Sequence, residues 1–400
     1  MSNKSIDGKP FLNNIVLGKK TKIFLRVLLW MEILVIGLYL LNIIFSYFIT
    51  GSFEIQNPFI FHYDVWIILL DTSTFNAMLR LSMPIALTAM GASFNERVGN
   101  INIGLEGIML WGAWAAVYFS YTTGNAWAGV IAAMFFGILI ALIHAVLTIT
   151  LKAEQIVTGV AINLLALGLT NVLTLVIWET QYSPIVETIP KFNFFTIPII
   201  GDILQFLSFS QYSNFPIIGV IFGTLPDPIK ILNNHNIMIY IGLLLIPLLH
   251  ILLFKTNIGL RFRVIGEHPQ TAATAGINVI KYQYAAVLIS GALAGLGGSI
   301  LSIGLASQFI QNASAGKGFI ALAAMIFGKW TIFGSVLGSV IFGYFFSLQI
   351  KFDILLRNFY VPNPFIQMIP YLVTILALTG FIGKARPPKH IGKPYDPTED

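Results

Sequence analysis

The segment IMIYIGLLLIPLLHILLF, residues 237–254, contains no charged side chain. A run of this length and composition is typical of a helix that crosses a bilayer, which needs about 20 mostly apolar residues. Similar runs recur along the chain, and they do not alternate between apolar and polar residues as barrel strands do. Backbone groups in lipid must be hydrogen-bonded within the protein, so such runs predict spanning helices. The sequence therefore predicts an all-α, polytopic membrane protein.

The composition supports this prediction and excludes several other classes. Hydrophobic residues make up 56% of the 400 positions and charged residues 10%, whereas soluble proteins contain about 25% charged residues. The absence of cysteine excludes disulfides, thiolate metal sites and cysteine nucleophiles. The first apolar run, residues 23–47, is longer than a signal-peptide core and lacks a small-residue cleavage site, so we expect a retained anchor helix.

Eight segments have the length and apolarity expected of spans: 23–47, 76–94, 103–121, 126–150, 155–178, 237–254, 282–305 and 365–383. Residues 64–79 are interrupted by polar side chains, and an interfacial helix is one interpretation of them. Residues 179–236 are rich in Pro, Phe and Asn, and we expect an extracytoplasmic excursion with short membrane-touching pieces. The sequence thus predicts a helical bundle of about eight to ten spans.

The distribution of basic residues predicts the orientation of the chain. With the tail 1–22 in the cytoplasm, most of the 23 Lys and Arg residues fall on the cytoplasmic side. Five fall outside: Lys191, Lys230, Lys317, Lys351 and Arg357. Such a bias is typical of membrane proteins. We expect one transmembrane domain over 23–383, a cytoplasmic loop at 255–281 and a cytoplasmic tail at 384–400.

A cytoplasmic C-terminus requires an unusual arrangement before the last span. The run GFIALAAMIFG, residues 318–328, has 11 residues, which form about 16 Å of helix, half the hydrocarbon thickness. A breaker, KWTIFG, and a second short run from Ser335 follow. We interpret the two runs as a re-entrant pair of half-helices, which membrane proteins tolerate inside protein or along a cavity. A kinked full span with an external C-terminus is the alternative.

The loop between 255 and 281 contains a short segment with a marked start and a marked end. Pro269 suits the first helical position, where its missing N–H needs no partner. Gly276 suits the left-handed conformation that ends a helix. The intervening QTAATA forms about two turns, too few to be stable alone in water. A partner must therefore hold it, unless the segment is simply a solvated basic loop.

The chemistry of this segment favours close contact with a partner. Its surface consists of small side chains: Ala272, Ala273, Thr274 and Ala275. Arg261 and Arg263 precede it, and Glu267 lies near its start, where the helix dipole favours an acid.

Four blocks of the chain, in order, resemble one family of membrane proteins. They are ERVGNINIGLEGIMLWGAW (96–114), GLRFRVIGEHPQTAATAGIN (259–278), ISGALAGLGGSILSIG (289–304) and GKGFIALAAMIFGKW (316–330). From about Leu81 to Gly383 the chain is similar to permease subunits of the ribose/branched-chain amino acid ABC importer superfamily, especially its nucleoside-type branch.

This resemblance implies a permease of the type II-importer kind in the plasma membrane. It implies three protein partners: an ABC ATPase, a second permease chain that is a copy or a paralogue, and an extracytoplasmic substrate-binding lipoprotein that delivers nucleosides. The ATPase would contact the cytoplasmic loop 255–281, which we call the coupling loop. The residues expected to make this contact are Arg261, Arg263, Glu267, Pro269, Ala272, Ala273, Ala275 and Gly276. A ribose- or pentose-type sugar permease is the alternative within the superfamily.

An ion-coupled secondary transporter is the alternative from another class. Such a protein needs several intramembrane carboxylates, and the spans offer only Glu32 and Glu106. Polar and aromatic candidates for a translocation path are Asn102, Glu106, Trp111, Asn163 and Trp330, although each also suits packing. A buried carboxylate such as Glu106 is expensive unless paired, and it could instead lock a helix N-terminus. Phosphate groups would require cationic partners in the spans, so a neutral solute is expected.

The stretch NASAGKGF, residues 312–319, superficially suggests a phosphate-binding loop. That motif needs a glycine at the position of Gln311 and Ser or Thr at that of Gly318. No catalytic triad or metal cluster is evident either. We therefore expect a transport subunit rather than an enzyme, with no bound cofactor and no nucleic-acid partner, and with ATP used by the partner ATPase.

Overall fold

The computed structural model describes residues 19–50, 58–193, 226–355, 362–372 and 386–396. Most of these residues are helical; the described strands are β1 (Lys191–Phe192) and β2 (His235–Asn236), which pair antiparallel. The chain forms two compact units, residues 1–68 with 352–366, and residues 69–351 with 367–400. The all-α prediction is confirmed.

The smaller unit contains α1 (Lys19–Thr50), most of α2 (Pro58–Leu70) and most of α16 (Asn363–Gln367). Helix α1 includes the predicted anchor and extends it by a few residues at each end. Glu32 on α1 lies 3.0 Å from Nε2 of His62 on α2. This carboxylate therefore has a partner on a neighbouring helix, as a purely structural acid would.

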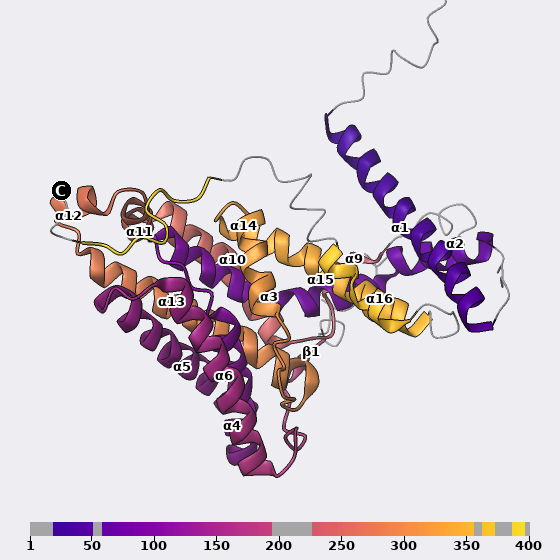
Figure 1. The fold of residues 1–400 in the computed structure, drawn as a ribbon, viewed down its shortest axis with the longest axis horizontal. Coiled ribbons are helices and arrows are strands. Elements are labelled where there is room, and N and C mark those ends of the chain that lie inside the picture. The colour runs from indigo at the N-terminus through magenta and orange to yellow at the C-terminus, as the bar shows by residue number, and fades with distance from the viewer. Residues whose placement is uncertain (1–18, 51–57, 194–225, 356–361, 373–385, 397–400) are drawn as a thin grey trace, which may run out of the picture. The chain divides into compact units, whose positions relative to one another are not determined.

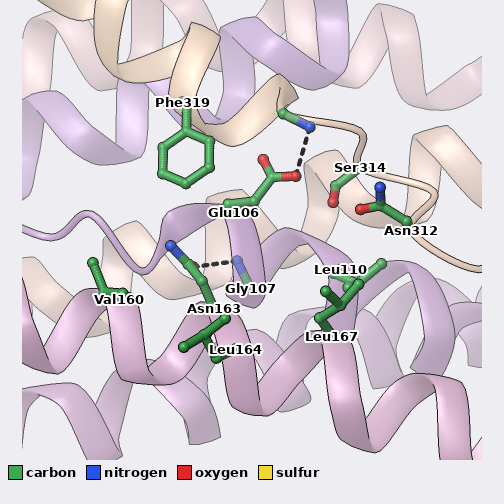
Figure 2. A pocket seen from close by; sticks show the side chains of 11 residues that line it. Glu106, Gly107, Leu110, Val160, Asn163, Leu164, Leu167, Asn312, Ser314 and Phe319 are labelled. Atoms are coloured by element: carbon green, nitrogen blue, oxygen red, sulfur yellow. Dashed lines mark hydrogen bonds between the residues drawn. The ribbon is translucent and has the colours of Figure 1, made fainter.

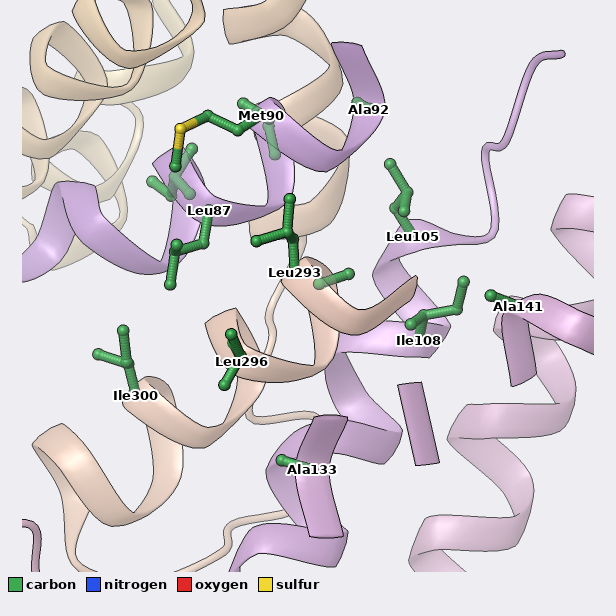
Figure 3. Close-up of a cluster of buried hydrophobic side chains, with 14 of the residues drawn as sticks. Leu87, Met90, Ala92, Leu105, Ile108, Ala133, Ala141, Leu293, Leu296 and Ile300 are labelled. Atoms are coloured by element: carbon green, nitrogen blue, oxygen red, sulfur yellow. The ribbon is translucent and has the colours of Figure 1, made fainter. Parts of the chain in front are cut away.

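Four helices form the centre of the larger unit. They are α3 (Thr72–Arg97), α4 (Leu105–Thr123), α5 (Ala126–Ala145) with its π-helical extension η2 (Val146–Thr150), and α13 (Val279–Ser299) with its extension η5 (Ile300–Ala306). Helix α13 packs along the other three. Figure 3 shows its Leu293 and Leu296 among side chains of α3, including Leu87 and Met90.

Glycines permit this close packing of α13. A Cβ atom on Gly112 of α4 would lie 2.6 Å from Cα of Gly295, and one on Gly137 of α5 would lie 2.3 Å from the carbonyl oxygen of Gly291. Membrane helices without a strong hydrophobic driving force associate through such small-residue contacts. The sequence GALAGLGG in α13 is therefore an interhelical surface.

The outer helices are α6 (Gln155–Trp178), α10 (Ile237–Lys255) and α15 (Ile332–Leu355). In the part of the chain that the structure describes, six helices are long and apolar enough to cross a membrane: α3, α5 with η2, α6, α10, α13 with η5, and α15. Five of these helices, all but α15, match predicted spans between residues 76 and 305, and α4 matches the sixth, to within about four residues at each end. The final predicted span, 365–383, is described only to residue 372. The uncertain stretch 64–79 is divided between α2 and α3 by a break at Asp71.

One end of the larger unit, which we call the base, gathers the loops that the sequence assigns to the cytoplasm. It contains the end of α3, the helices α11 (Asn257–Glu267) and α12 (Pro269–Thr274), and the tail 386–396. His390 N donates to Gly266 O (3.0 Å) and Gly392 N donates to Gly99 O (2.8 Å). Figure 1 shows this C-terminal trace beside α11. The tail and the 255–281 loop thus lie at the same end.

The predicted pair of half-helices is correct in its first member and wrong in its second. Helix α14 (Lys317–Phe327) has 11 residues, as expected. Helix α15 has 24 residues, about 36 Å of helix, which is enough to cross the bilayer. Gly338 and Gly343 do not interrupt α15. Instead they let α15 pack so closely against α14 and α3 that neither position has room for a Cβ atom.

An irregular segment and the half-helix together make the crossing before α15. Residues 307–316 begin beside the excursion, where Ser183 N donates to Phe309 O (2.9 Å), and end beside the start of α4. Helix α14 continues to the base, where Arg97 Nε donates to Trp330 O (2.9 Å). Irregular backbone is tolerated at membrane depth when it is enclosed by protein. This crossing accounts for the return of the tail to the base.

Candidate functional site

The short helix of the coupling loop begins and ends where the sequence predicts. Pro269 is the first residue of α12, and Gly276 has a left-handed φ of +79° just after its end. The sequence analysis missed α11, the longer helix before it. Its signal was present, because Thr256 Oγ1 accepts from Gly259 N (3.1 Å) and caps that helix.

The small residues of α12 face in two directions, not one. Pro269 and Ala272 are buried, and Ala272 has no exposed surface. Ala273 is half-buried, whereas Ala275 and Gly276 are exposed. The prediction that Ala272 contacts a partner is therefore wrong, because Ala272 packs against the bundle. Ala275 is exposed and remains available to a partner.

The two arginines of the loop turn back onto neighbouring helices. Arg261 Nη1 donates to the hydroxyl of Tyr282 on α13 (2.8 Å). The Arg263 guanidinium lies 5.4 Å from the ring centroid of Phe254 on α10, a distance at which cation–π attraction operates. Both side chains thus anchor α11 to spanning helices while part of each remains accessible.

Further contacts connect the loop to the base. Glu267 interacts electrostatically with Arg97 at the end of α3. Lys389 Nζ of the tail lies 3.4 Å from Nε2 of His268, between α11 and α12. The coupling loop is therefore attached to α3, α10, α13 and the tail. The tail contacts were not predicted, since no motif in the tail marks its place in the fold.

Glu106 joins two helix N-termini. It lies in the first turn of α4, and its carboxylate oxygens accept from Gly316 N (2.7 Å) and Gly318 N (2.6 Å) at the start of α14. A helix N-terminus carries unpaired N–H groups and a partial positive charge, which an anion satisfies. The interpretation of Glu106 as a partner of a helix N-terminus is therefore confirmed, although the helix concerned is α14.

Glu106 also lines a pocket of about 370 Å³ between α4, α6 and the segment that leads into α14. Figure 2 shows this pocket from close by, with Phe319 on one side and leucines of α4 and α6 on the other. Its polar lining includes Glu106, Asn163, Asn312 and Ser314, and the rest is mainly apolar. Such a pocket, mostly apolar with a few placed polar groups, is typical of small-molecule sites.

Asn163 lies in the pocket wall but uses both ends of its amide to hold α4. Its Oδ1 accepts from Gly107 N (2.8 Å), and its Nδ2 donates to Ile103 O (3.0 Å). Nearby, His144 Nε2 lies within hydrogen-bonding distance, 3.2 Å, of Ile101 O. These contacts fix the start of α4, and hence the direction of the Glu106 side chain.

The remaining predicted path residues lie away from this pocket. Asn102 is fully buried and does not line the pocket, and neither of its amide atoms has a partner among the residues that the structure places. Trp111 stacks on Phe136 of α5, with ring centroids 6.0 Å apart and an interplanar angle of 18°. Trp330 lies at the base and donates to Glu96 Oε2 (2.6 Å). The structure thus unites Glu106 and Asn163 and separates the two tryptophans from them.

Nine of the 11 residues that line the pocket were not named as path residues, among them Asn312, Ser314 and Phe319. The segment 312–319 was tested as a phosphate-binding loop and rejected. Lys317, which the sequence assigns to the outer side, is half-buried in the structure: its Nζ donates to Ser314 O (3.3 Å) and lies 5.9 Å from the Phe346 ring centroid.

Comparisons with known proteins cover most of the chain. The family model of the permease component of branched-chain amino acid transport systems matches residues 74–378. The guanosine ABC transporter permease NupQ of Bacillus subtilis is 41% identical over 329 residues, which cover 80% of this chain and 95% of that protein.

Two other relatives show how far this similarity extends. The nucleoside ABC transporter permease NupC of Lactococcus lactis is 38% identical over 324 residues, with 80% and 95% of the two chains covered. A putative glucose ABC transporter permease of Haloferax volcanii is 32% identical over 278 residues, with 69% and 76% covered. No solved structure matches the chain.

Proposed function

The chain belongs to the family of branched-chain amino acid transport permease components, and from this membership we propose that it is the permease subunit of an ABC importer for nucleosides. The observation that carries the substrate class is the similarity, along 95% of their lengths, to guanosine and nucleoside permeases. The sugar alternative is supported by a less similar relative over a smaller part of the chain. The chain is a multi-pass membrane protein, and we infer that its N-terminus is cytoplasmic.

The proposed ATPase contact is the exposed side of α12, at Ala275 and neighbouring residues. Two observations support it. The helix has six residues, too few to be stable alone, and its inner side is seated by buried Pro269 and Ala272. A partner that pushes on the outer side would therefore move a rigid body attached to α3, α10 and α13, not a free loop.

Three partners and one energy source complete the proposal. An ABC ATPase binds at the base and hydrolyses ATP. A second permease chain, either a copy or a paralogue, completes the path. An extracytoplasmic lipoprotein delivers the nucleoside. The chain itself requires no cofactor in this scheme. Nucleic acid has no part in it.

A pull-down experiment tests the ATPase contact. Ala275→Trp adds a large side chain at an exposed position, and Ala273→Arg adds a charge beside it; both should abolish co-purification with the ATPase while membrane insertion persists. Ala306→Trp provides the matched control, because Ala306 is also exposed but lies at the opposite end of α13 and its extension. Unchanged complex yield in both loop variants would refute the contact.

A further inference from the structure

The pocket between α4, α6 and the start of α14 is built for more than packing. We propose that it is a binding site for an uncharged nucleoside within this chain. The inference rests on the proposed function and deepens it, since it identifies the residues that hold the solute during transport.

The apolar part of the pocket suits a planar base. Phe319 of α14 lines the pocket and is 46% exposed. Leu164 and Leu167 of α6 line the opposite side, and they are exposed as well. Figure 2 shows the Phe319 ring on one side of the pocket and these leucines on the other. An aromatic ring and an aliphatic wall form the kind of slot in which an aromatic ligand stacks.

The polar part of the pocket suits the hydroxyl groups of a sugar. Ser314 has no exposed surface, and its hydroxyl has no hydrogen-bond partner in the described part of the chain. A buried hydroxyl without a partner is costly and requires an explanation. Figure 2 shows this hydroxyl and the Asn312 amide on the same side of the pocket, near Glu106. Each Glu106 oxygen accepts one backbone N–H and retains a lone pair for a ligand hydroxyl.

The charge of the pocket selects against phosphate. Glu106 is the charged residue among those that line it. Lys317 interacts electrostatically with Glu106, and its ammonium is already held by Ser314 O and the Phe346 ring. A nucleoside monophosphate would bring a second negative charge to Glu106, and one lysine cannot balance both, which is unfavourable at low dielectric.

The backbone of the wall is bent to build this site. Asn312 (φ +59°), Ala315 (φ +45°) and Gly316 (φ +82°) all adopt positive φ within five residues. Such conformations are strained for residues other than glycine, and they cluster at ligand-binding sites. Here they turn the N–H groups of Gly316 and Gly318 towards Glu106 and hold Asn312 and Ser314 at the pocket.

Cysteine protection tests the site directly, because the chain contains no cysteine. Leu164→Cys places a thiol in the pocket wall, and Leu175→Cys places one on the same helix, outside the pocket, at another exposed position. Both variants are examined in the intact permease–ATPase complex in nanodiscs, after uptake assays show that they transport guanosine. Guanosine at tenfold its half-protecting concentration should slow maleimide labelling of Leu164→Cys about tenfold and leave Leu175→Cys unchanged. Guanosine monophosphate should protect neither variant.

A second variant tests whether the Phe319 ring contacts the bound nucleoside. Phe319→Ala should raise the half-protecting guanosine concentration at least fivefold, since loss of base–aromatic stacking reduces binding by about 1–3 kcal/mol. Phe135→Ala, which removes an exposed ring from α5, should change nothing. If the complex transports guanosine but guanosine leaves Leu164→Cys labelling unchanged, or if that thiol never reacts, the site is refuted while the importer assignment stands. If the unmodified complex does not transport guanosine, the importer assignment fails first.

Discussion

Replacing Glu106 with glutamine isolates the charge that holds the half-helix. Gln has nearly the same shape as Glu but only one acceptor oxygen, so its NH₂ group must face one of the two backbone donors, Gly316 N or Gly318 N. Glu154 provides the matched control. It also receives two N–H groups at a helix N-terminus, from Ile156 (3.2 Å) and Val157 (2.6 Å).

The two positions differ in burial, and burial determines the expected magnitude. Glu106 is 8% exposed, so Glu106→Gln leaves a buried donor unpaired and weakens a charge-assisted hydrogen bond. Each effect reduces the free energy of unfolding by about 1–3 kcal/mol, and we expect a total of about 2–6 kcal/mol. Glu154 is exposed, so water can replace the lost acceptor, and Glu154→Gln should cost about 0.3–1 kcal/mol.

Equilibrium unfolding in mixed micelles, followed by tryptophan fluorescence, measures both free energies. Trp330 is a useful reporter because it lies just beyond α14, the helix that Glu106 holds. The reasoning requires Glu106→Gln to lose several times more stability than Glu154→Gln. Equal losses, or no loss at Glu106, would mean that its carboxylate does not hold α14 in place.

Three further predictions concern the wall, the tail and a buried histidine. Gly318→Ala should destabilise the protein by about 1–3 kcal/mol in the same unfolding assay, because its Cβ would lie 2.5 Å from Glu106 Cα. The control Gly168→Ala should be neutral or slightly stabilising, because nothing lies within 4 Å of its Cβ. Deletion of residues 387–400 should preserve membrane insertion but reduce ATPase co-purification, since the tail that bridges α3 and α11 is lost. Burial lowers the pKa of His235, so the wild type should lose stability as the pH falls from 7 to 5, below the ordinary histidine pKa of about 6.5. His235→Asn should lose less over that range, and equal pH profiles would contradict this cause.

Helix positions could be predicted from the sequence because the bilayer imposes them. A span needs enough apolar length to cross the hydrocarbon, and this requirement acts on each segment independently. Residues 155–178 illustrate the point, since the predicted and observed bounds of α6 coincide. The start and end of α12 were predictable for a similar reason: Pro269 and Gly276 act through their own backbone chemistry.

The crossing between α13 and α15 could not be predicted in the same way. Residues 307–316 are not helical, and only Phe309 and Ser314 among them are buried, so neither hydropathy nor periodicity marks the segment. Their backbone is satisfied by distant partners, such as Glu106, which is 210 residues from Gly316. The sequence analysis assumed that a short helix must return to the side from which it came, and this produced the incorrect half-helix pair.

The candidate site was partly predictable for the same physical reason. A carboxylate in a span is conspicuous, so Glu106 was identified from the sequence, but its partners were not. Trp111 and Asn163 carried equal weight as path residues until their surroundings were known. The structure distinguishes them, because Trp111 faces an aromatic ring of α5 and Asn163 faces the pocket. Ser314 is an ordinary serine in the sequence, and only its burial without a partner marks it.

Uptake by reconstituted vesicles tests the central claim most directly. The vesicles contain this permease, its partner permease, the ATPase and the binding protein, and labelled guanosine is supplied outside with ATP at the ATPase side. We predict accumulation that requires ATP and the ATPase and does not respond to a protonophore. Accumulation driven by an ion gradient alone, or ATP-driven uptake that ribose abolishes and nucleosides do not, would contradict the account.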